Sequence, residues 1–199
     1  MREVIINKTL NVLNNTYNYD SDTLDRVKYG LETIYISITK MIVILLISII
    51  LGSTKETILT IIFVNGIRTY AYGMHAKKSW HCYVESTVVF VLLPYIFRNL
   101  IINTTQKIII SIICIIGYAV FAPADTHKRP LVNKNHRNKL KKNSIIVCLI
   151  YIFVIFFSNN NLINNIIILS MITELFLINP IIYKLFDMPY NNYMTYQSK

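Results

Sequence analysis

Long runs of apolar residues with few or no charges constrain this chain more than any other feature of its sequence. Two runs, 108–122 and 144–157, carry no charged residue, and a third at 31–51 carries only Glu32 and Lys40. A bilayer core about 30 Å thick is crossed by roughly 20 helical residues. Because the runs are continuous and show no period of two, they favour membrane-spanning helices over the strands of a membrane barrel.

Three further apolar stretches complete a predicted set of about six spanning helices. They begin near Thr57, Thr87 and Leu162, and the last of them contains one acid, Glu174. The alternative is a soluble all-α protein with Ile-rich buried helices, but soluble chains seldom hold several uncharged apolar runs of this length. We therefore expect an all-α polytopic membrane protein.

The N-terminal segment, residues 1–30, differs in composition from the predicted transmembrane bundle, residues 31–183. We expect the two to form a single integral membrane domain over residues 1–199. Apolar residues recur in the N-terminal segment at helical spacing, at Ile6, Leu10, Leu13 and Tyr17. This spacing predicts a helix that lies in the membrane interface or packs on a partner subunit. Ser21 is the predicted N-cap of a second helix that leads into the first span.

The charged residues predict the orientation of the chain in the membrane. The chain has 20 Lys and Arg against 10 Asp and Glu, a net charge of +10 that in a soluble protein would suggest a nucleic-acid partner. Here the basic residues gather in alternate loops, and the basic loop 126–143 holds seven of them and no acid. By the positive-inside rule, both termini, the region of His75 and this loop lie in the cytoplasm. Nucleic acid is therefore not an expected partner, whereas the lipid bilayer is.

Most chemically reactive residues gather in one cytoplasmic segment, 68–85. Its notable members are Arg68, Gly73, His75, Lys77, Lys78, Ser79, Trp80, His81, Cys82 and Glu85. A thiol attacks a carbonyl as the thiolate, so it needs a base nearby or positive surroundings. One interpretation of the segment is therefore a thiol nucleophile, Cys82, with His75 as its base.

The spacing of this pair limits the local fold. On one continuous helix, His75 and Cys82 would be about 10.5 Å apart along the axis, too far for a hydrogen bond of about 3 Å. We therefore expect the chain to bend between Ala76 and Trp80. His81 is a poorer base, because adjacent side chains on a helix diverge.

Two other interpretations of the segment remain open at this point. One is a metal site built from His75, His81, Cys82 and His127, although no recognised metal-ligand spacing is present. The other is an inert thiol beside basic residues that reach toward the membrane interface. Cys114 and Cys148 lie within uncharged apolar runs, where cysteine behaves as a small hydrophobic residue. Only Cys82 has polar and basic neighbours in the sequence.

The residues Arg68, Gly73, His75-Ala76 and Cys82 together resemble the signature of the accessory gene regulator protein B (AgrB) family of bacterial membrane cysteine endopeptidases. Two further stretches, 28–32 (KYGLE) and 121–130 (FAPADTHKRP), resemble the entry to the first span and the end of the fourth in that family. The resemblance covers nearly the whole chain. Tyr72 stands where members often have a second glycine.

The resemblance implies a function. Cys82 would attack a peptide bond in a small AgrD-type propeptide, and His75 would be its base. The thioester formed would pass to the propeptide's own cysteine, giving a thiolactone ring for quorum sensing. Arg68 and Gly73 match family positions associated with activity. No metal or other cofactor is expected, and the family implies a homodimer in the bacterial cell membrane.

Several roles stay open on sequence grounds. Lys77, Lys78 and the basic loop would attract an acidic propeptide tail, or the loop would only set topology and contact anionic lipid. Glu174 would mark function inside the bundle or pair with a Tyr hydroxyl near a helix end. The alternatives to a protease are a small peptide export channel, lined by Arg68, His75 and Glu174, and a non-catalytic scaffold.

The charge pattern makes a prediction about orientation. A reporter fused near Lys134 should give a cytoplasmic signal, because the basic loop is held on that side of the membrane. Paired reporters that are active on opposite sides of the membrane would measure this directly. An extracytoplasmic signal at Lys134 would contradict the assignment.

Overall fold

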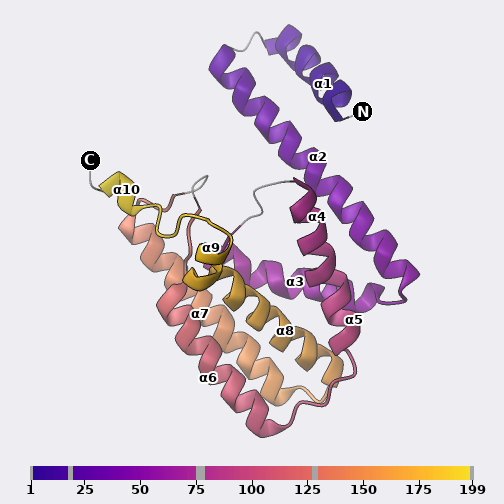
Figure 1. The fold of residues 1–199 in the computed structure, drawn as a ribbon, viewed down its shortest axis with the longest axis vertical. Coiled ribbons are helices and arrows are strands. Elements are labelled where there is room, and N and C mark those ends of the chain that lie inside the picture. Colours follow the sequence, from indigo (N-terminus) through magenta and orange to yellow (C-terminus); the bar gives the residue numbers. More distant parts are fainter. Residues whose placement is uncertain (1, 18–19, 75–78, 127–129, 198–199) are drawn as a thin grey trace. The chain divides into compact units, whose positions relative to one another are not determined.

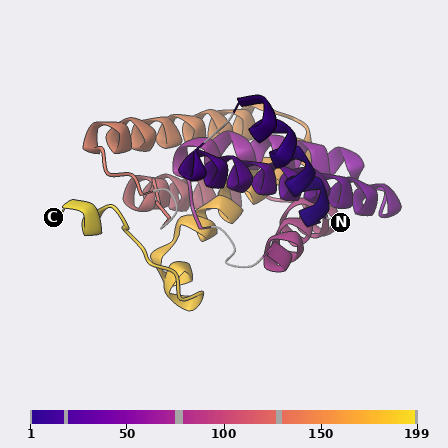
Figure 2. The ribbon, with the colours of Figure 1, turned by 90° about the horizontal axis from the view of Figure 1, so that it is seen from above.

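The computed structural model describes residues 2–17, 20–74, 79–126 and 130–197 (Figure 1 and Figure 2). These residues form helices and no strand, which confirms the expected all-α polytopic class. The helices are α1 (Arg2–Tyr17), α2 (Ser21–Ile50), α3 (Thr54–Ala71), α4 (Ser79–Thr87), α5 (Leu93–Phe97), α6 (Thr104–Phe121), α7 (Lys134–Phe157), α8 (Asn161–Ile178), α9 (Pro180–Leu185) and α10 (Met194–Gln197). A π-helical turn, Val88–Leu92, joins α4 to α5.

Among the described residues, five helical segments are long and apolar enough to cross a membrane. They are α2, the continuous segment Trp80–Phe97, α6, α7 and α8. The sequence predicted about six. The remaining predicted span corresponds to α3, which has 18 residues but carries three charges, Lys55, Glu56 and Arg68.

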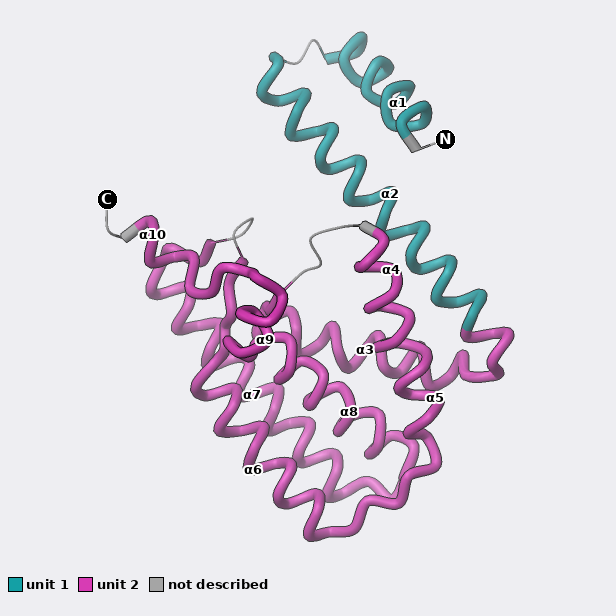
Figure 3. The backbone as a smooth tube through the Cα atoms, viewed as in Figure 1, with its two compact units in different colours: residues 1–47 teal, residues 48–199 magenta. Residues whose placement is uncertain are grey.

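The chain separates into two compact units, residues 1–47 and residues 48–199 (Figure 3). The first unit holds α1 and most of α2. Along α2, the hydroxyls of Thr33, Ser37 and Thr39 each donate to a carbonyl four residues earlier, over 2.8 Å. Inside a bilayer there is no water to accept these hydroxyl hydrogens, so hydrogen bonds within the helix are expected for a membrane-spanning segment.

The start of α2 differs by one residue from the prediction that Ser21 is its cap. Ser21 is the first helical residue, and the carbonyl of Asp20 accepts from the Leu24 amide over 2.9 Å. A hydrogen bond from the Thr23 side chain lowers the pKa of the Asp20 carboxyl below its ordinary value. Asp20 therefore caps α2, where its negative charge also suits the helix dipole.

In the second unit, α8 is the central helix of the bundle. It packs against α3, α5, α6 and α7, and eleven of its eighteen residues are buried. Large apolar residues occur on every side of α8, which suits such a central position. The core of the unit draws on α3, α6, α7, α8 and α9, with Ile67, Tyr118, Ile155, Met171 and Tyr183 among its fully or nearly fully buried members.

Helices α3 and α7 approach closely at Gly66. A Cβ at this position would collide with the Tyr151 hydroxyl, so the glycine lets the two helices meet. That hydroxyl donates to the Phe63 carbonyl over 2.8 Å, and the Phe63 and Tyr151 rings meet edge to face at 5.4 Å. The contact fixes α3 against the bundle ahead of its last turn.

The helix that carries Cys82 is continuous with a spanning segment. The sequence predicted a span from Thr87 to Phe97, and the structure extends the helix back to Ser79. Within it, the Leu93 amide donates to the Val88 carbonyl, five residues earlier. Pro94 follows and has no amide hydrogen to donate, so the regular α-helical pattern cannot continue through it.

The C-terminal segment is tied to the end of α6 through Asp125. The Asp125 side chain is 1% exposed and accepts backbone N–H groups from Leu131 (3.2 Å), Asn192 (2.9 Å) and Tyr193 (2.8 Å). Nearby, the Tyr190 hydroxyl donates to the Phe121 carbonyl over 3.4 Å. Burial is the main cause that raises the pKa of Tyr190 above its ordinary value.

Asp125→Asn should release this segment. Both carboxylate oxygens of Asp125 accept backbone amides, so either orientation of an asparagine places its NH₂ against an N–H donor. We expect the free energy of local opening to fall by about 2–4 kcal/mol. Hydrogen exchange of residues 186–197 would measure this, with Asp22→Asn at the exposed start of α2 as the control. Unchanged protection of 186–197 would contradict the proposed anchor.

Candidate functional site

The last turn of α3 places Arg68 against a buried acid of α8. Arg68 Nη1 lies 3.3 Å from Glu174 Oε2, and the two side chains are 21% and 0% exposed. A buried carboxylate is costly unless a cation and hydrogen bonds compensate it. The pair therefore joins α3 to α8 at the end of the bundle where both helices finish.

The same guanidinium also holds the turn that follows α3. Arg68 Nη2 donates to the Met74 carbonyl over 2.6 Å. The Tyr72 amide donates back to the Arg68 carbonyl over 2.9 Å and closes the helix. Arg68 thus makes contacts to Glu174 and to the Met74 backbone at once, which its planar fork of donors allows.

Both residues of this turn have positive φ angles. Tyr72 has φ 64° and Gly73 has φ 112°, in a region that glycine enters far more readily than other residues. Tyr72 occupies the position where the resembled family often has glycine. Tyr72, the residue at which this sequence departs from the family pattern, therefore has a backbone conformation that favours glycine.

Gly73 packs against α8 as closely as a residue without a side chain can. A Cβ at this position would lie 3.2 Å from Glu174 Oε1 and 3.3 Å from the Leu177 carbonyl oxygen. The next amide, that of Met74, donates to the Leu177 carbonyl over 3.1 Å. The turn therefore rests on the last turns of α8.

The structure brings the segment after α6 beside this turn. The Gly73 amide donates to the Ala124 carbonyl, and the Ala124 amide donates to the Ala71 carbonyl, both over 2.9 Å. The Tyr183 hydroxyl donates toward the carbonyls of Ala124 (3.4 Å) and Asp125 (3.2 Å). Burial, with the nearby Asp125 carboxylate, raises the pKa of Tyr183 well above its ordinary value. Two motifs that are far apart in the sequence are thus hydrogen-bonded to each other.

Glu174 is the residue whose position the sequence left most open. Its Oε2 oxygen contacts Arg68, and no hydrogen bond to a Tyr hydroxyl is found among the residues that the structure describes. Its other oxygen, Oε1, is buried and accepts no hydrogen bond within the described ranges. An acid inside an apolar run was the available signal, but its partner, 106 residues earlier, was not predictable from spacing.

Cys82 lies on the first turns of α4 and is part-exposed, whereas Cys114 and Cys148 are fully buried. Helix α3 ends at Ala71, and the described part of α4 begins at Ser79. The predicted bend at 76–80 falls largely outside the described residues. His75, Lys77 and Lys78 also lie outside them, so their positions stay predictions.

The metal interpretation of the sequence used four side chains, of which two, His75 and His127, lie outside the described residues. Within the described part, no group of three His, Cys, Asp or Glu side chains is placed to hold a metal ion. The His81 ring instead meets the Trp80 ring edge to face at 3.8 Å.

One hollow in the described surface lies away from these residues. It has a volume of about 840 Å³ and is lined by residues 98–101 and 158–162. This is the end of the bundle where α8 begins, whereas Glu174 is near the end of the same helix. The hollow is therefore separate from the Arg68–Glu174 site.

The fold is that of a polytopic all-α protein. Its site consists of a turn held by Arg68 and Glu174, followed along the chain by helix α4, which carries a part-exposed cysteine. The model of the family "Accessory gene regulator B" (AgrB) matches residues 6–178. The chain belongs to this family, which gives it a role in the accessory gene regulator (agr) quorum-sensing system.

Similar proteins support this membership. An AgrB-like protein of Listeria innocua is 30% identical over 197 residues, which cover 99% of this chain and 94% of the relative. An AgrB-like protein of Clostridium acetobutylicum is 33% identical over 185 residues, covering 93% and 88%. The accessory gene regulator protein B of Staphylococcus aureus is 36% identical over 140 residues, covering 68% and 74%. No solved structure matches the chain.

Gly73→Ala should weaken the turn. The new methyl group would meet Glu174 and Leu177 at a backbone angle that alanine rarely adopts, at a cost of about 2–4 kcal/mol. Gly52→Ala is the matched control: Gly52 also has positive φ, but nothing lies within 4 Å of its Cβ position, so it should cost only about 1 kcal/mol. Thermal unfolding in detergent would compare the two. Equal losses of stability would contradict the tight packing at Gly73.

Proposed function

We propose that the chain is a membrane-embedded cysteine endopeptidase that cleaves an AgrD-type propeptide and promotes thiolactone formation. The observation that carries this proposal is the contrast among the three cysteines. In a chain of the AgrB family, Cys82 alone is part-exposed, and it lies on the helix that follows the Arg68–Gly73 turn. The Cys114 and Cys148 thiols are sealed in the bundle, so a peptide cannot reach them.

The chemistry would proceed in two acyl transfers. His75 takes the Cys82 proton, and the Sγ thiolate attacks the carbonyl carbon of the scissile peptide bond. The C–N bond then breaks, His75 returns the proton to the leaving amine, and a thioester to Cys82 remains. The propeptide's own cysteine attacks this thioester as the thiolate, which closes the thiolactone ring and releases the Cys82 thiolate.

Arg68 and Gly73 would shape the site. Arg68 already contacts Glu174 and the Met74 carbonyl, which favours a role in holding the turn over a role in binding a substrate carboxylate. Gly73 would permit the turn that presents His75. Neither residue is proposed to touch the reacting atoms.

The basic residues would attract an acidic propeptide tail. We propose that Lys77, Lys78 and the basic loop 126–143 do so from the cytoplasmic side of the bacterial cell membrane. No acidic residue lies next in sequence to the basic residues near the start of α7, such as Lys134, Arg137 and Lys139. The proposal includes a homodimer, as the family resemblance implies.

Co-expression with an AgrD-type propeptide tagged at both ends tests the proposal. Wild type should release a C-terminal fragment, whereas Cys82→Ser and His75→Ala should lower the rate of release by about 10³-fold or more, because each removes a member of the reacting pair. Cys148→Ala is the matched control, since it removes a buried thiol of the bundle, and it should keep cleavage within a few-fold of wild type.

Persistent cleavage in both active-site variants would refute the endopeptidase. If wild type exports the peptide without cutting it, the result would favour the export channel instead. Immunoblotting of cell and medium fractions separates these outcomes.

A further inference from the structure

We propose that Glu174 is a positioning residue for the proposed reaction. Through Arg68 and Gly73 it would hold the backbone of Met74, the residue directly before His75. It would thereby fix the backbone position from which the His75 side chain extends toward Cys82. This inference rests on the proposed function and adds a residue whose role the sequence left open. Glu174 is not proposed to contact the substrate.

The first support is the way Glu174 is held. Its side chain is 0% exposed on a helix with no other charged residue, and its charge partner among the described residues is Arg68, 3.3 Å away. A buried acid is costly to keep, and a hydrophobic residue of similar volume is often as stable or more so. A role that needs the carboxylate explains its presence better than stability does.

The second support is that both backbone groups of Met74 are fixed. Its amide donates to the Leu177 carbonyl over 3.1 Å, and its carbonyl accepts from Arg68 Nη2 over 2.6 Å. Glu174 and Leu177 are three residues apart on α8, so they lie on one face of that helix. One face of α8 therefore holds both backbone groups of Met74: the Leu177 carbonyl binds its N–H directly, and Glu174 holds its carbonyl through Arg68.

The third support is the contact between Glu174 and Gly73. Glu174 Oε1 would lie 3.2 Å from a Cβ at Gly73, so the carboxylate forms part of the wall against which the turn packs. Glu174 thus acts on consecutive residues of the turn: on Gly73 by packing, and on Met74 through Arg68. A lysine at position 68 would not reproduce this arrangement, because its donors share one nitrogen, whereas Arg68 reaches its two acceptors from separate nitrogens, Nη1 and Nη2.

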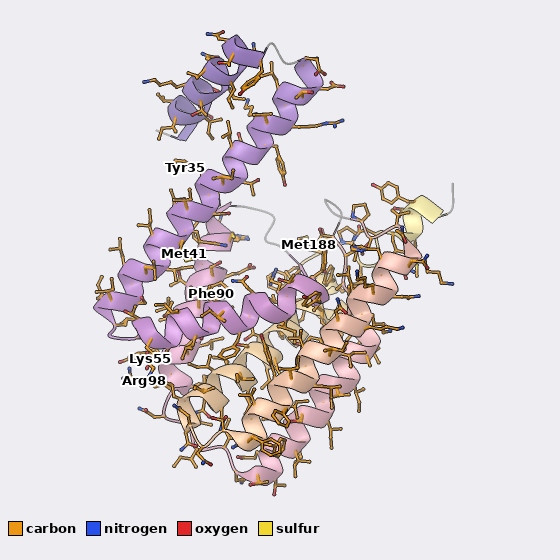
Figure 4. The ribbon with its side chains drawn as sticks, turned by 180° about the vertical axis from the view of Figure 1, so that it is seen from behind. Tyr35, Met41, Lys55, Phe90, Arg98 and Met188 are labelled. Carbon is orange, nitrogen blue, oxygen red and sulfur yellow. The ribbon has the colours of Figure 1, made fainter. Side chains whose placement is uncertain are left out.

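A second ion pair in the same unit provides a matched comparison. Arg98 Nη1 lies 3.9 Å from Glu56 Oε1, with side chains 31% and 12% exposed. Glu56 is in the first turn of α3, whereas Arg68 is in its last, and Figure 4 shows Arg98 beside Lys55 at that other end of α3. Loss of this pair should leave the Met74 turn unaffected.

The first experiment measures cleavage by the full chain in native membranes. With an AgrD-type propeptide as the probe, Glu174→Gln should lower kcat by about 10- to 100-fold, the scale expected for a misplaced catalytic group, and leave KM within about threefold. Glu56→Gln should stay within about twofold of wild type in both constants. A wild-type kcat in Glu174→Gln would overturn the proposal.

Because Glu174→Gln leaves Arg68 without its carboxylate, a second variant guards against misfolding. Arg68→Gln combined with Glu174→Gln removes both charges together, so the membrane level of the protein should return to that of wild type. Cleavage should stay low, because glutamine does not restore the fork to Met74. Recovery of both protein level and cleavage would show that the pair serves only stability, and would overturn the proposal.

The third readout needs no substrate. Alkylation of each cysteine by N-ethylmaleimide, followed by peptide mass spectrometry over a range of pH, reports the thiolate of Cys82 separately from the two buried thiols. Glu174→Gln should move the Cys82 alkylation midpoint in the same direction as His75→Ala, with Cys114 and Cys148 still protected. Faster labelling of the buried thiols would instead indicate a loosened bundle and count against positioning.

The His75 variant separates this inference from the proposed function. If His75→Ala shifts the Cys82 profile and Glu174→Gln does not, the Cys–His pair stands and the role of Glu174 is wrong. If His75→Ala leaves the profile unchanged, the proposed base fails, and positioning through His75 fails with it. Matching shifts in both variants support both proposals.

Discussion

A carboxylate buried in an apolar bundle requires a cation within hydrogen-bonding reach, and in this protein Glu174 has that cation in Arg68. The requirement determines the approach of two helices, because Arg68 ends α3 and Glu174 lies near the end of α8. Since Arg68 also holds the Met74 carbonyl, the same pair fixes the chain where it leaves the bundle. The segment that follows begins from a defined backbone position.

Three parts of the chain meet around this pair. The turn after α3 bonds to Ala124 after α6, and to Leu177 near the end of α8. Tyr183 of α9 then closes the group by donating toward the Ala124 and Asp125 carbonyls. Backbone groups at a helix end need partners, and inside an apolar bundle other chain segments must supply them. In this chain, the two family-like motifs at 68–76 and 121–130 are therefore held together by these backbone hydrogen bonds.

The sequence predicted the features that depend on local pattern. Apolar runs gave the helices, and the contrast in neighbours separated Cys82 from Cys114 and Cys148. It did not predict that Arg68 pairs with Glu174, because contacts between residues 106 apart in the chain depend on packing. It also placed the cap of α2 on Ser21 instead of Asp20, since both residue types cap helices well and spacing does not decide between neighbours.

The two deeply buried acids also bear on the electrostatics of the proposed site. Glu174 is compensated by Arg68, and Asp125 by backbone N–H groups from residues 131, 192 and 193. Both carboxylates therefore have partners within the fold, and the loop 126–143 contains no acid of its own. Because a positive surface attracts anionic segments only when its charges are not already neutralised, burying these acids would preserve the attraction of that loop for an acidic peptide tail.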